Sequence, residues 1–522
     1  MKDFNVNIDD IDTQQIKTRN IFFKLVILSV SIFISIKYYN HNNQEKLVKT
    51  DLYKIYEEQN NDKNIIFNKN NVKSPYMPQG INECERYDPL NLFQIRFKSE
   101  PIYLCKSDIS EHLCYINKGF LSIFKKGVTC QMKNFILNTS KWKAEQEEDL
   151  YIESINSNNL FFSKGLFSMK CEKQEKIENF NPKYGPYFNS WEYSKKSKDE
   201  QKKGEVIEEL AAGKSLLFIN RNKDSTNLFF SALSIMNTLL IIEHFNLNLE
   251  NIQVVFFESN KINIDPLYDI YKNVISKGGD PIHVNQLKNK VYNIKEAYYV
   301  PINWDSPCFT LFPNIPNCNK STKGYMYFNE LINKYMKIPN FIEPTIYNED
   351  IYYYPKNISN PNSPNYTTFL TVQWRRVWPK NRVNQERLLG NGIELVEKLY
   401  EVLPKSTLIR LVDTANLTIT EQISLMKKTD YLLGVHGAGF LLSVFLPLTS
   451  IVNEINTEYK SKNLEILSKL SGHKTYIDNL SYEEENIEGN SYIYFSPKVI
   501  SERVYKRMNE TFYIKGFKHS FL

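Results

Sequence analysis

The sequence predicts an α/β protein with two Rossmann-like lobes behind a single N-terminal signal-anchor helix. Strand-length apolar runs alternate with helix-length runs in two blocks, residues 201–310 and 366–522. The segment between them, residues 311–365, is rich in Pro, Asn and Tyr, which is typical of a connector. Alternating strands and helices indicate parallel sheets with right-handed crossovers, and two such blocks predict two lobes that face a cleft.

Composition fits a large globular protein and excludes a nucleic-acid binder. The chain has 522 residues, of which 42% are hydrophobic and 14% aromatic, so a sizeable core is expected. The net charge is only +6, and lysines and acids are interspersed rather than grouped in blocks. We therefore expect no nucleic acid among the partners.

The N-terminus predicts a membrane anchor. A polar tail, residues 1–20, precedes an apolar segment at 21–39. The charge-free part is shorter than the about 20 residues that a spanning helix needs. However, Lys24 can snorkel, and Tyr38 and Tyr39 suit a membrane interface. A cleaved signal peptide is the alternative, although no small-residue cleavage site follows.

The region after the anchor predicts a lumenal body. Residues 40–80 are polar and Asn-rich, as in a stem, and residues 81–200 carry most of the cysteines, which predicts a disulfide-stapled extension. Cys308 and Cys318 flank a short Pro-rich loop and are predicted to pair; because no C-x-x-C pair occurs, a zinc site is not expected. The N-glycosylation sequons begin at Asn138, Asn319, Asn357, Asn365, Asn416, Asn479 and Asn509.

Apolar periodicity places the elements of the two blocks. In the first, we expect strands at Leu216–Ile219, Ile252–Phe257 and Val291–Val300, and helices at Asn227–His244 and Asp265–Ile275. In the second, we expect strands at Thr368–Val372 and Thr407–Val412, helices at Gln385–Tyr400 and Thr420–Lys427, and then the unit 430–454.

That last unit, DYLLGVHGAGFLLSVFLPLTSIVNE, is the most informative stretch. It predicts a strand at Tyr431–Leu433, an apolar helix from Phe440 to Leu446, and a strand that ends near Glu454. The turn between the first strand and the helix contains Gly434, His436, Gly437, Ala438 and Gly439. A glycine-rich turn at a helix N-terminus suits a phosphate or diphosphate. An ordinary tight turn is the alternative, but a polar turn where a strand ends is where open α/β sheets bind ligands.

Basic residues follow the strand at Thr368–Val372 and should reach the same sheet edge as the turn. They are Arg375, Arg376, Lys380 and Arg382, interleaved with Trp374 and Trp378. We expect the basic side chains to strengthen the anion site at the turn and the tryptophans to stack on a base or sugar. The alternatives are a solvated basic loop and tryptophans that simply pack.

The motif G-V-H-G-A-G-F, with Asp430 before it and F-L-P and Glu454 after it, closely resembles the signature of family 61 glycosyltransferases. Glu421 and Gln422 fit an acidic-Gln pair that often precedes this signature. The resemblance extends loosely over residues 216–476. It implies a two-lobe fold of the GT-B type and inverting transfer of a sugar from a nucleotide sugar.

The resemblance also implies roles for single residues. The turn from Gly434 to Phe440 would neutralise the diphosphate, together with the Arg that relatives carry after the preceding strand. Arg375 lies about two residues later than that Arg, so the choice between Arg375 and Arg376 is open. Asn384 matches an Asn at the next helix start. Glu454 would hold a ribose or sugar hydroxyl, with a capping or surface role as the alternative.

The acceptor-side base is the point at which this chain departs from the family. Relatives carry N-x-x-H or N-x-x-H-H in the helix that starts here at Asn227, with an acid a few residues later, and both are absent. Glu258 occupies the place of an Asp common in relatives and is the candidate base. Asp224 and Asp305 are further candidates, and a core or surface carboxylate is the alternative for each. Asp413 ends a strand at the same edge, whereas Asp430 lies at the opposite edge and is expected to be structural.

Together these observations predict a single-pass type II glycosyltransferase of the Golgi or endoplasmic reticulum membrane with a lumenal catalytic body. From the resemblance, the donor is a UDP-sugar carrying N-acetylglucosamine or xylose. The acceptor would be a protein Ser/Thr, an N-glycan or a polysaccharide. Without a convincing D-x-D triplet we expect no metal, and no other cofactor.

Two other functions are weighed against this one. The missing His and acid favour a catalytically inactive homologue that binds nucleotide sugars or acts as a scaffold in the secretory pathway. A nucleotide-dependent oxidoreductase is disfavoured, because the G-x-G-x-x-G order and an acid about 20 residues later are not both present.

Overall fold

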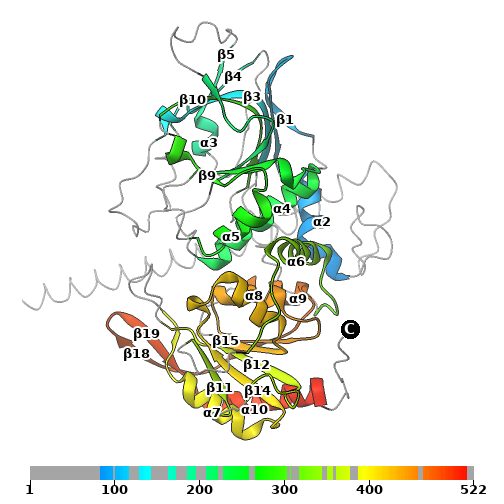
Figure 1. The fold of residues 1–522 in the computed structure, drawn as a ribbon, viewed down its shortest axis with the longest axis vertical. Helices are drawn as coiled ribbons and strands as arrows, with labels where there is room; N and C mark the ends of the chain where they lie inside the picture. Colours follow the sequence, from blue (N-terminus) through cyan, green and yellow to red (C-terminus); the bar gives the residue numbers. More distant parts are fainter. Residues whose placement is uncertain are drawn as a thin grey trace, which may run out of the picture. The chain divides into compact units, whose positions relative to one another are not determined.

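The computed structural model confirms the predicted α/β class and describes most of the chain after the stem (Figure 1). The described residues are 83–97, 100–116, 128–142, 163–171, 185–194, 207–220, 227–257, 265–287, 289–301, 306, 315, 317–343, 350–356, 360–376, 386–456 and 463–513. Within these ranges, no helix has the length and apolar character needed to cross a bilayer. The predicted tail, anchor and stem lie outside them, and the anchor stays a prediction.

The first sheet combines the predicted lobe with the cysteine-containing region before it. Its main path runs β1 (Ile102–Lys106), β2 (Glu111–Ile116), β3 (Val128–Asn138), β10 (Val291–Val300), β7 (Ser215–Ile219), β8 (Ile252–Phe256) and β9 (Ile282–His283), with β4 (Phe167–Lys170), β5 (Trp191–Ser194) and β6 (Ile207–Glu209) at its sides. Strands β7 to β10 are mutually parallel, whereas β1, β2 and β3 extend the sheet in antiparallel fashion from β10. The region 81–200 therefore contributes strands to this sheet.

The long helix of the first block is buried on nearly all sides. Helix α4 (Leu228–His244) is capped by the Asn227 side chain, and its middle turns are buried without interruption from Ser231 to Ile242. It belongs to a core cluster that also includes residues of α8 and α9 from the second block. A helix that is apolar all round suits this position between two layers. The predicted second helix is present as α5 (Tyr268–Ile270), continued by a π-turn to Ile275.

The second sheet has the doubly wound order β11-β14-β12-β15-β16-β17. Its strands are β11 (Ile351–Tyr354), β12 (Thr368–Gln373), β14 (Thr407–Val412), β15 (Tyr431–Val435), β16 (Ile451–Asn456) and β17 (Lys474–Asn479), all parallel except β11. From β12 the chain steps to β14 on one side and later to β15, β16 and β17 on the other. The gap between β12 and β15 is therefore the topological switch point, where open α/β sheets bind ligands.

Helices cover both faces of this sheet, as Figure 1 shows. Helices α7 (Gly392–Val402) and α10 (Pro497–Met508) pack on one face. Helices α8 (Ile419–Lys427) and α9 (Asn463–Leu470) pack on the other, in the core cluster that includes α4 and α6 (Lys323–Met336). Both faces are covered, so β12, β14, β15 and β16 are buried along almost their whole length.

One predicted helix begins later than expected. The sequence predicted a helix over Gln385–Tyr400, but Leu388–Leu389 form β13 and α7 begins at Gly392. Gly390 and Asn391 separate the two, and Tyr494 packs closely against Gly390. Strand β13 joins the hairpin of β18 (Glu483–Ile487) and β19 (Asn490–Tyr494) in a small third sheet.

The predicted Cys308–Cys318 disulfide is wrong, because Cys318 is bonded to Cys84. The reason is tertiary: the segment of η1 (Glu83–Tyr87) and α2 (Pro89–Arg96) packs on α6. There the buried Asp88 carboxylate accepts the Gly324 N–H in the first turn of α6, at 2.6 Å. Two further disulfides join Cys105 to Cys171 and Cys114 to Cys130, while Cys308 lies outside the described residues.

Candidate functional site

Three parallel strands end side by side at the switch point of the second sheet. In the register, Gln373 of β12 lies opposite Gly434 of β15, and Gly434 lies opposite Glu454 of β16. Since the carboxyl ends of parallel strands meet at one edge, the segments that follow β12 and β15 leave the sheet together. The start of the predicted basic segment, at Arg375 and Arg376, therefore lies at the same edge as the glycine-rich turn.

The helix after the turn differs from the predicted one. It is a 3₁₀ helix, η13, from Ala438 to Phe445, and it starts two residues before Phe440. Its tighter geometry is visible in the Phe440 N–H bond to the Gly437 carbonyl, at 3.1 Å. The first N–H groups of such a helix have no partner within the helix, so its start, at Gly437 to Gly439, retains the character of an anion site.

The turn glycines are needed for space and not for backbone conformation. None of Gly434, Gly437 and Gly439 has a φ in the left-handed region, and Gly437 is fully extended at φ 177°. A Cβ at Gly434 would lie 3.1 Å from the Gln373 Cβ, and one at Gly437 would overlap the Arg375 guanidinium. The glycines therefore let two side chains from the end of β12 pack directly on the turn, a reason that the sequence pattern did not reveal.

Arg375 is the arginine that contacts the turn. Its Nη1 donates to the His436 carbonyl at 2.9 Å. Arg376 is exposed and lies over the Trp374 ring, 4.7 Å from the centroid. The Trp374 indole N–H donates to the Leu389 carbonyl at 3.1 Å, so this tryptophan packs within the lobe. The structure thus separates two arginines that the sequence left equivalent.

His436 and Glu454 form a buried pair beside the turn. The imidazole Nδ1 is hydrogen-bonded to the Glu454 carboxylate, and the two residues are only 5% and 2% exposed. The predicted contact of Glu454 with a ribose or sugar hydroxyl stays a prediction, and in the structure this carboxylate is hydrogen-bonded to the histidine. A carboxylate acceptor requires a proton on Nδ1, which leaves Nε2 as the nitrogen that Glu454 does not engage.

Gln373 is a site residue that the sequence analysis missed. It is the last residue of β12, and its side-chain amide donates to the Gly439 carbonyl at 3.1 Å. Together with Arg375 it ties the end of β12 to the turn after β15. The sequence did contain a signal for it, because Gln373 is a polar residue at the end of a mainly apolar strand.

Other acidic residues near the motif have structural roles. The Asp430 carboxylate accepts the Phe369 N–H at 2.8 Å, at the opposite edge of the sheet, as predicted. Glu421 forms a capping box with Thr418 at the start of α8. Asp413 is buried at the end of β14, where its backbone N–H donates to the Asp350 carbonyl.

The predicted acceptor-side residues Glu258, Asp224 and Asp305 lie outside the described residues. So do four of the donor-side residues, Trp378, Lys380, Arg382 and Asn384. The parallel strands β7, β8 and β10, which precede the three acids, end at one edge of the first sheet, at Ile219, Phe256 and Val300. Their roles stay predictions.

The structure shows which residues lie at the start of α4, where relatives carry the His and the acid. The buried Ser231, on the first turns of α4, donates its hydroxyl proton to the Asp265 carboxylate at 2.6 Å. The same oxygen of Asp265 accepts the Leu267 N–H at 2.8 Å, so the carboxylate also caps the turn into α5. A carboxylate is thus present beside α4, although it comes from a later segment than in the relatives.

Comparison with known proteins finds a family match over part of the chain. Residues 285–452 match a family model whose description is Glycosyltransferase 61. The matched region runs from before β10 through β15 and includes Gln373, Arg375 and the whole turn from Gly434 to Gly439. It ends two residues before Glu454. None of the curated proteins matches the chain.

Proposed function

We propose that this chain, a glycosyltransferase with a family 61 domain, transfers a sugar with inversion from a UDP-sugar to a hydroxyl acceptor. The match over residues 285–452 supports glycosyl transfer and implies a nucleotide-sugar donor and an acceptor. One observation supports our proposal that the donor binds at the switch point of the second sheet. The turn at His436–Gly439, Arg375 and the buried His436–Glu454 pair converge at the switch point between β12 and β15.

The proposed reaction is a displacement at the anomeric carbon. The bond from that carbon to the diphosphate oxygen breaks, a bond to the acceptor oxygen forms on the opposite face, and the acceptor proton passes to a base. Negative charge grows on the departing diphosphate, so preorganised donors aimed at it lower the barrier. The start of η13 and the Arg375 guanidinium supply such donors, and the bond from Arg375 to the His436 carbonyl holds the guanidinium at the turn.

Glu454 determines how His436 contributes. Because Nδ1–H faces the carboxylate, Nε2 can donate a hydrogen bond only when the imidazole is a cation. We propose that the Nε2–H of the imidazolium donates to a diphosphate oxygen, while Glu454 orients the ring and touches no substrate.

The finer assignments rest on the sequence. We propose Glu258 as the base, with Asp224 as the alternative, and N-acetylglucosamine or xylose as the sugar. The acceptor would be a protein Ser/Thr, an N-glycan or a polysaccharide. A signal-anchor at 21–39 would hold a lumenal body in the Golgi or endoplasmic reticulum membrane, and transfer would need no metal or other cofactor.

The test uses the full-length chain in detergent with a panel of UDP- and GDP-sugars. Donor binding and donor hydrolysis are measured for the natural chain, His436→Ala and Glu258→Gln. Glu483→Gln, which changes an exposed carboxylate on β18, is the matched control. Hydrolysis of one UDP-sugar that both site variants lose and the control keeps would support the proposal. Folded protein that binds no nucleotide would overturn it.

A nucleotide-sugar-binding scaffold without turnover is the second candidate function. It is motivated by Phe230 and Ser231, which stand where relatives carry histidines. Binding that depends on His436, with no transfer to any member of a broad acceptor panel, would favour this scaffold over the enzyme.

A further inference from the structure

A second group of chemically reactive side chains lies far from the turn, on one face of the β2–β3 ladder. In the antiparallel register, His112 lies opposite Met132 and Cys114 lies opposite Cys130. Alternate residues of a strand point to the same face, so all four share one side of the sheet. All four are completely buried. The pattern H-x-C on one strand and C-x-M on the next thus concentrates one nitrogen and three sulfur atoms.

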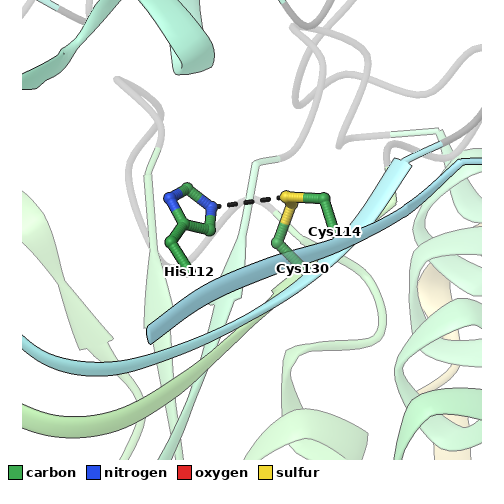
Figure 2. A group of neighbouring side chains, drawn as sticks. All are labelled: His112, Cys114 and Cys130. Atoms are coloured by element: carbon green, nitrogen blue, oxygen red, sulfur yellow. Dashed lines mark hydrogen bonds between the residues drawn. A yellow bond between two sulfur atoms is a disulfide. The ribbon is translucent and has the colours of Figure 1, made fainter. Parts of the chain in front are cut away.

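These atoms are close together. Figure 2 shows the His112 imidazole directed at the Cys114 sulfur, with Nε2 at 3.4 Å, and Cys114 bonded to Cys130. One ligating atom from each of these three residues lies within 4.8 Å of the others. The Tyr187 hydroxyl connects the fourth, since it lies 3.3 Å from Nε2 and donates to the Met132 sulfur at 2.8 Å.

The imidazole is held in place by its neighbours. Its Nδ1 is hydrogen-bonded to the Tyr193 hydroxyl at 2.9 Å, which directs Nε2 toward the sulfur atoms. The Trp191 ring packs against it, with centroids 4.2 Å apart. Ligand orientation and the surrounding shell are therefore set by the fold.

We propose that His112, Cys114, Cys130 and Met132 form a site for one monovalent copper ion when the Cys114–Cys130 disulfide is reduced. An external dithiol or phosphine supplies two electrons and is itself oxidised, and each sulfur of the broken S–S bond takes up a proton. Copper binding then releases the proton of each thiol that ligates it. Thiolate and thioether sulfur with one imidazole is a soft ligand set, which suits Cu(I) better than a hard cation.

In the disulfide-bonded state the two cysteine sulfurs are bonded to each other, so neither is a thiolate that could ligate a metal. The same four residues therefore have two exclusive states, one cross-linked and one metal-binding. The choice between them depends on the reducing power of the surroundings. The alternative is a disulfide that only joins β2 to β3, in which case the nearby imidazole and thioether would have no effect on copper.

The first experiment is a copper titration on the full-length chain. The chain is reduced anaerobically with a phosphine, freed of reductant, and titrated with Cu(I) against a chromogenic copper chelator. We expect one tightly held equivalent, which the double variant Cys114→Ser, Cys130→Ser loses. The matched control, Cys105→Ser with Cys171→Ser, removes the neighbouring disulfide and should retain that equivalent.

A conservative variant tests the ligand set without touching a cysteine. Met132→Leu keeps the size and apolar character of the side chain, so the chain should still fold, but it should weaken Cu(I) binding at least tenfold. An unchanged affinity would overturn the four-ligand site. So would loss of the folded state on reduction, since no preorganised site would then exist.

Alkylation provides a readout at single residues. Copper should protect Cys114 and Cys130 of the reduced chain from iodoacetamide at least tenfold, while Cys105 and Cys171 react at the same rate with and without copper. Equal reactivity of all four cysteines in both conditions would contradict the proposal.

Discussion

In the second sheet, polar side chains gather where β12, β15 and β16 end. In the described part of the first sheet, a polar side chain of β2, His112, is instead buried among aromatic rings. Gln373, Arg375 and Glu454 all hold the turn of β15 from neighbouring strands. His112, by contrast, is enclosed by Tyr187, Trp191 and Tyr193. In the function proposed above, the first arrangement would hold the diphosphate of the donor, whereas the second keeps the His112 imidazole away from solvent.

The comparison shows that a buried histidine has different consequences according to its partner. His436 is hydrogen-bonded to the Glu454 carboxylate. His112 in the first sheet and His473, next to β17 in the second, are fully buried, and burial lowers the pKa to about 3 and about 4, respectively. Four predictions, in order of decreasing expected effect, test this contrast.

The largest effect is acid destabilisation through the two neutral histidines. In the folded chain they stay uncharged, whereas in the unfolded chain they take up protons below pH about 6.5. Stability is therefore complete above that pH and falls as pH decreases toward the folded pKa of each group. At the low-pH limit, the shifts correspond to roughly 5 kcal/mol for His112 and roughly 3 kcal/mol for His473. Urea unfolding at pH 7 and pH 5 measures the loss.

Gln variants of the two histidines provide the control. The Gln side chains of His112→Gln and His473→Gln cannot be protonated. Each variant should therefore lose the part of the pH dependence of the unfolding free energy that its histidine causes. Identical curves for the natural chain and both variants would contradict this account.

The next effect concerns a buried ion pair beneath the second sheet. Arg410 and Glu343 are fully buried, with Nη1 2.8 Å from the carboxylate, and Arg410 Nη2 also donates to the Lys428 carbonyl. Arg410→Met would leave the buried Glu343 carboxylate with the more distant and partly exposed Lys428, at 3.8 Å, and should lower the unfolding free energy by about 3–5 kcal/mol. Donor affinity of the protein that remains folded should not change. The double variant Arg410→Met, Glu343→Leu should recover part of the loss, and failure to recover any would show that the pair is not the cause.

The third effect is local to the turn. Gly437→Ala should expel Arg375, because the new Cβ overlaps its guanidinium. Transfer efficiency, kcat/KM, should fall by about a hundredfold, the size expected when a preorganised donor is lost. Adding Arg375→Ala should relieve the overlap and restore thermal stability without restoring transfer. A Gly437→Ala chain with normal kcat/KM would show that Arg375 is not needed at the turn.

The smallest effect should come from Glu454→Gln, which removes the charge beside His436 but keeps its shape. We expect kcat to fall by about tenfold, with little change in KM, as for other residues that act through a neighbour. An unchanged kcat would leave Glu454 with a packing role only.

The site was predicted in part because its elements are consecutive in the chain. The strand at Tyr431, the glycine-rich turn and the strand ending near Glu454 are written in one continuous stretch, so periodicity and glycine spacing locate them. The partners of the turn were harder. Arg375 and Arg376 are adjacent and chemically equal, and only the packing of Trp374 and the space at Gly437 distinguish them.

The sequence by itself determined the order of strands and helices, the parallel character of the second sheet and the family motif. Each depends on residues within a few positions of one another. Only the tertiary structure decided that Cys84 bonds Cys318, that Glu454 holds His436, and that four donors of β2 and β3 share one buried face. Those contacts depend on how separate segments dock, and local periodicity carries no information on which side chains meet across a sheet or between helices.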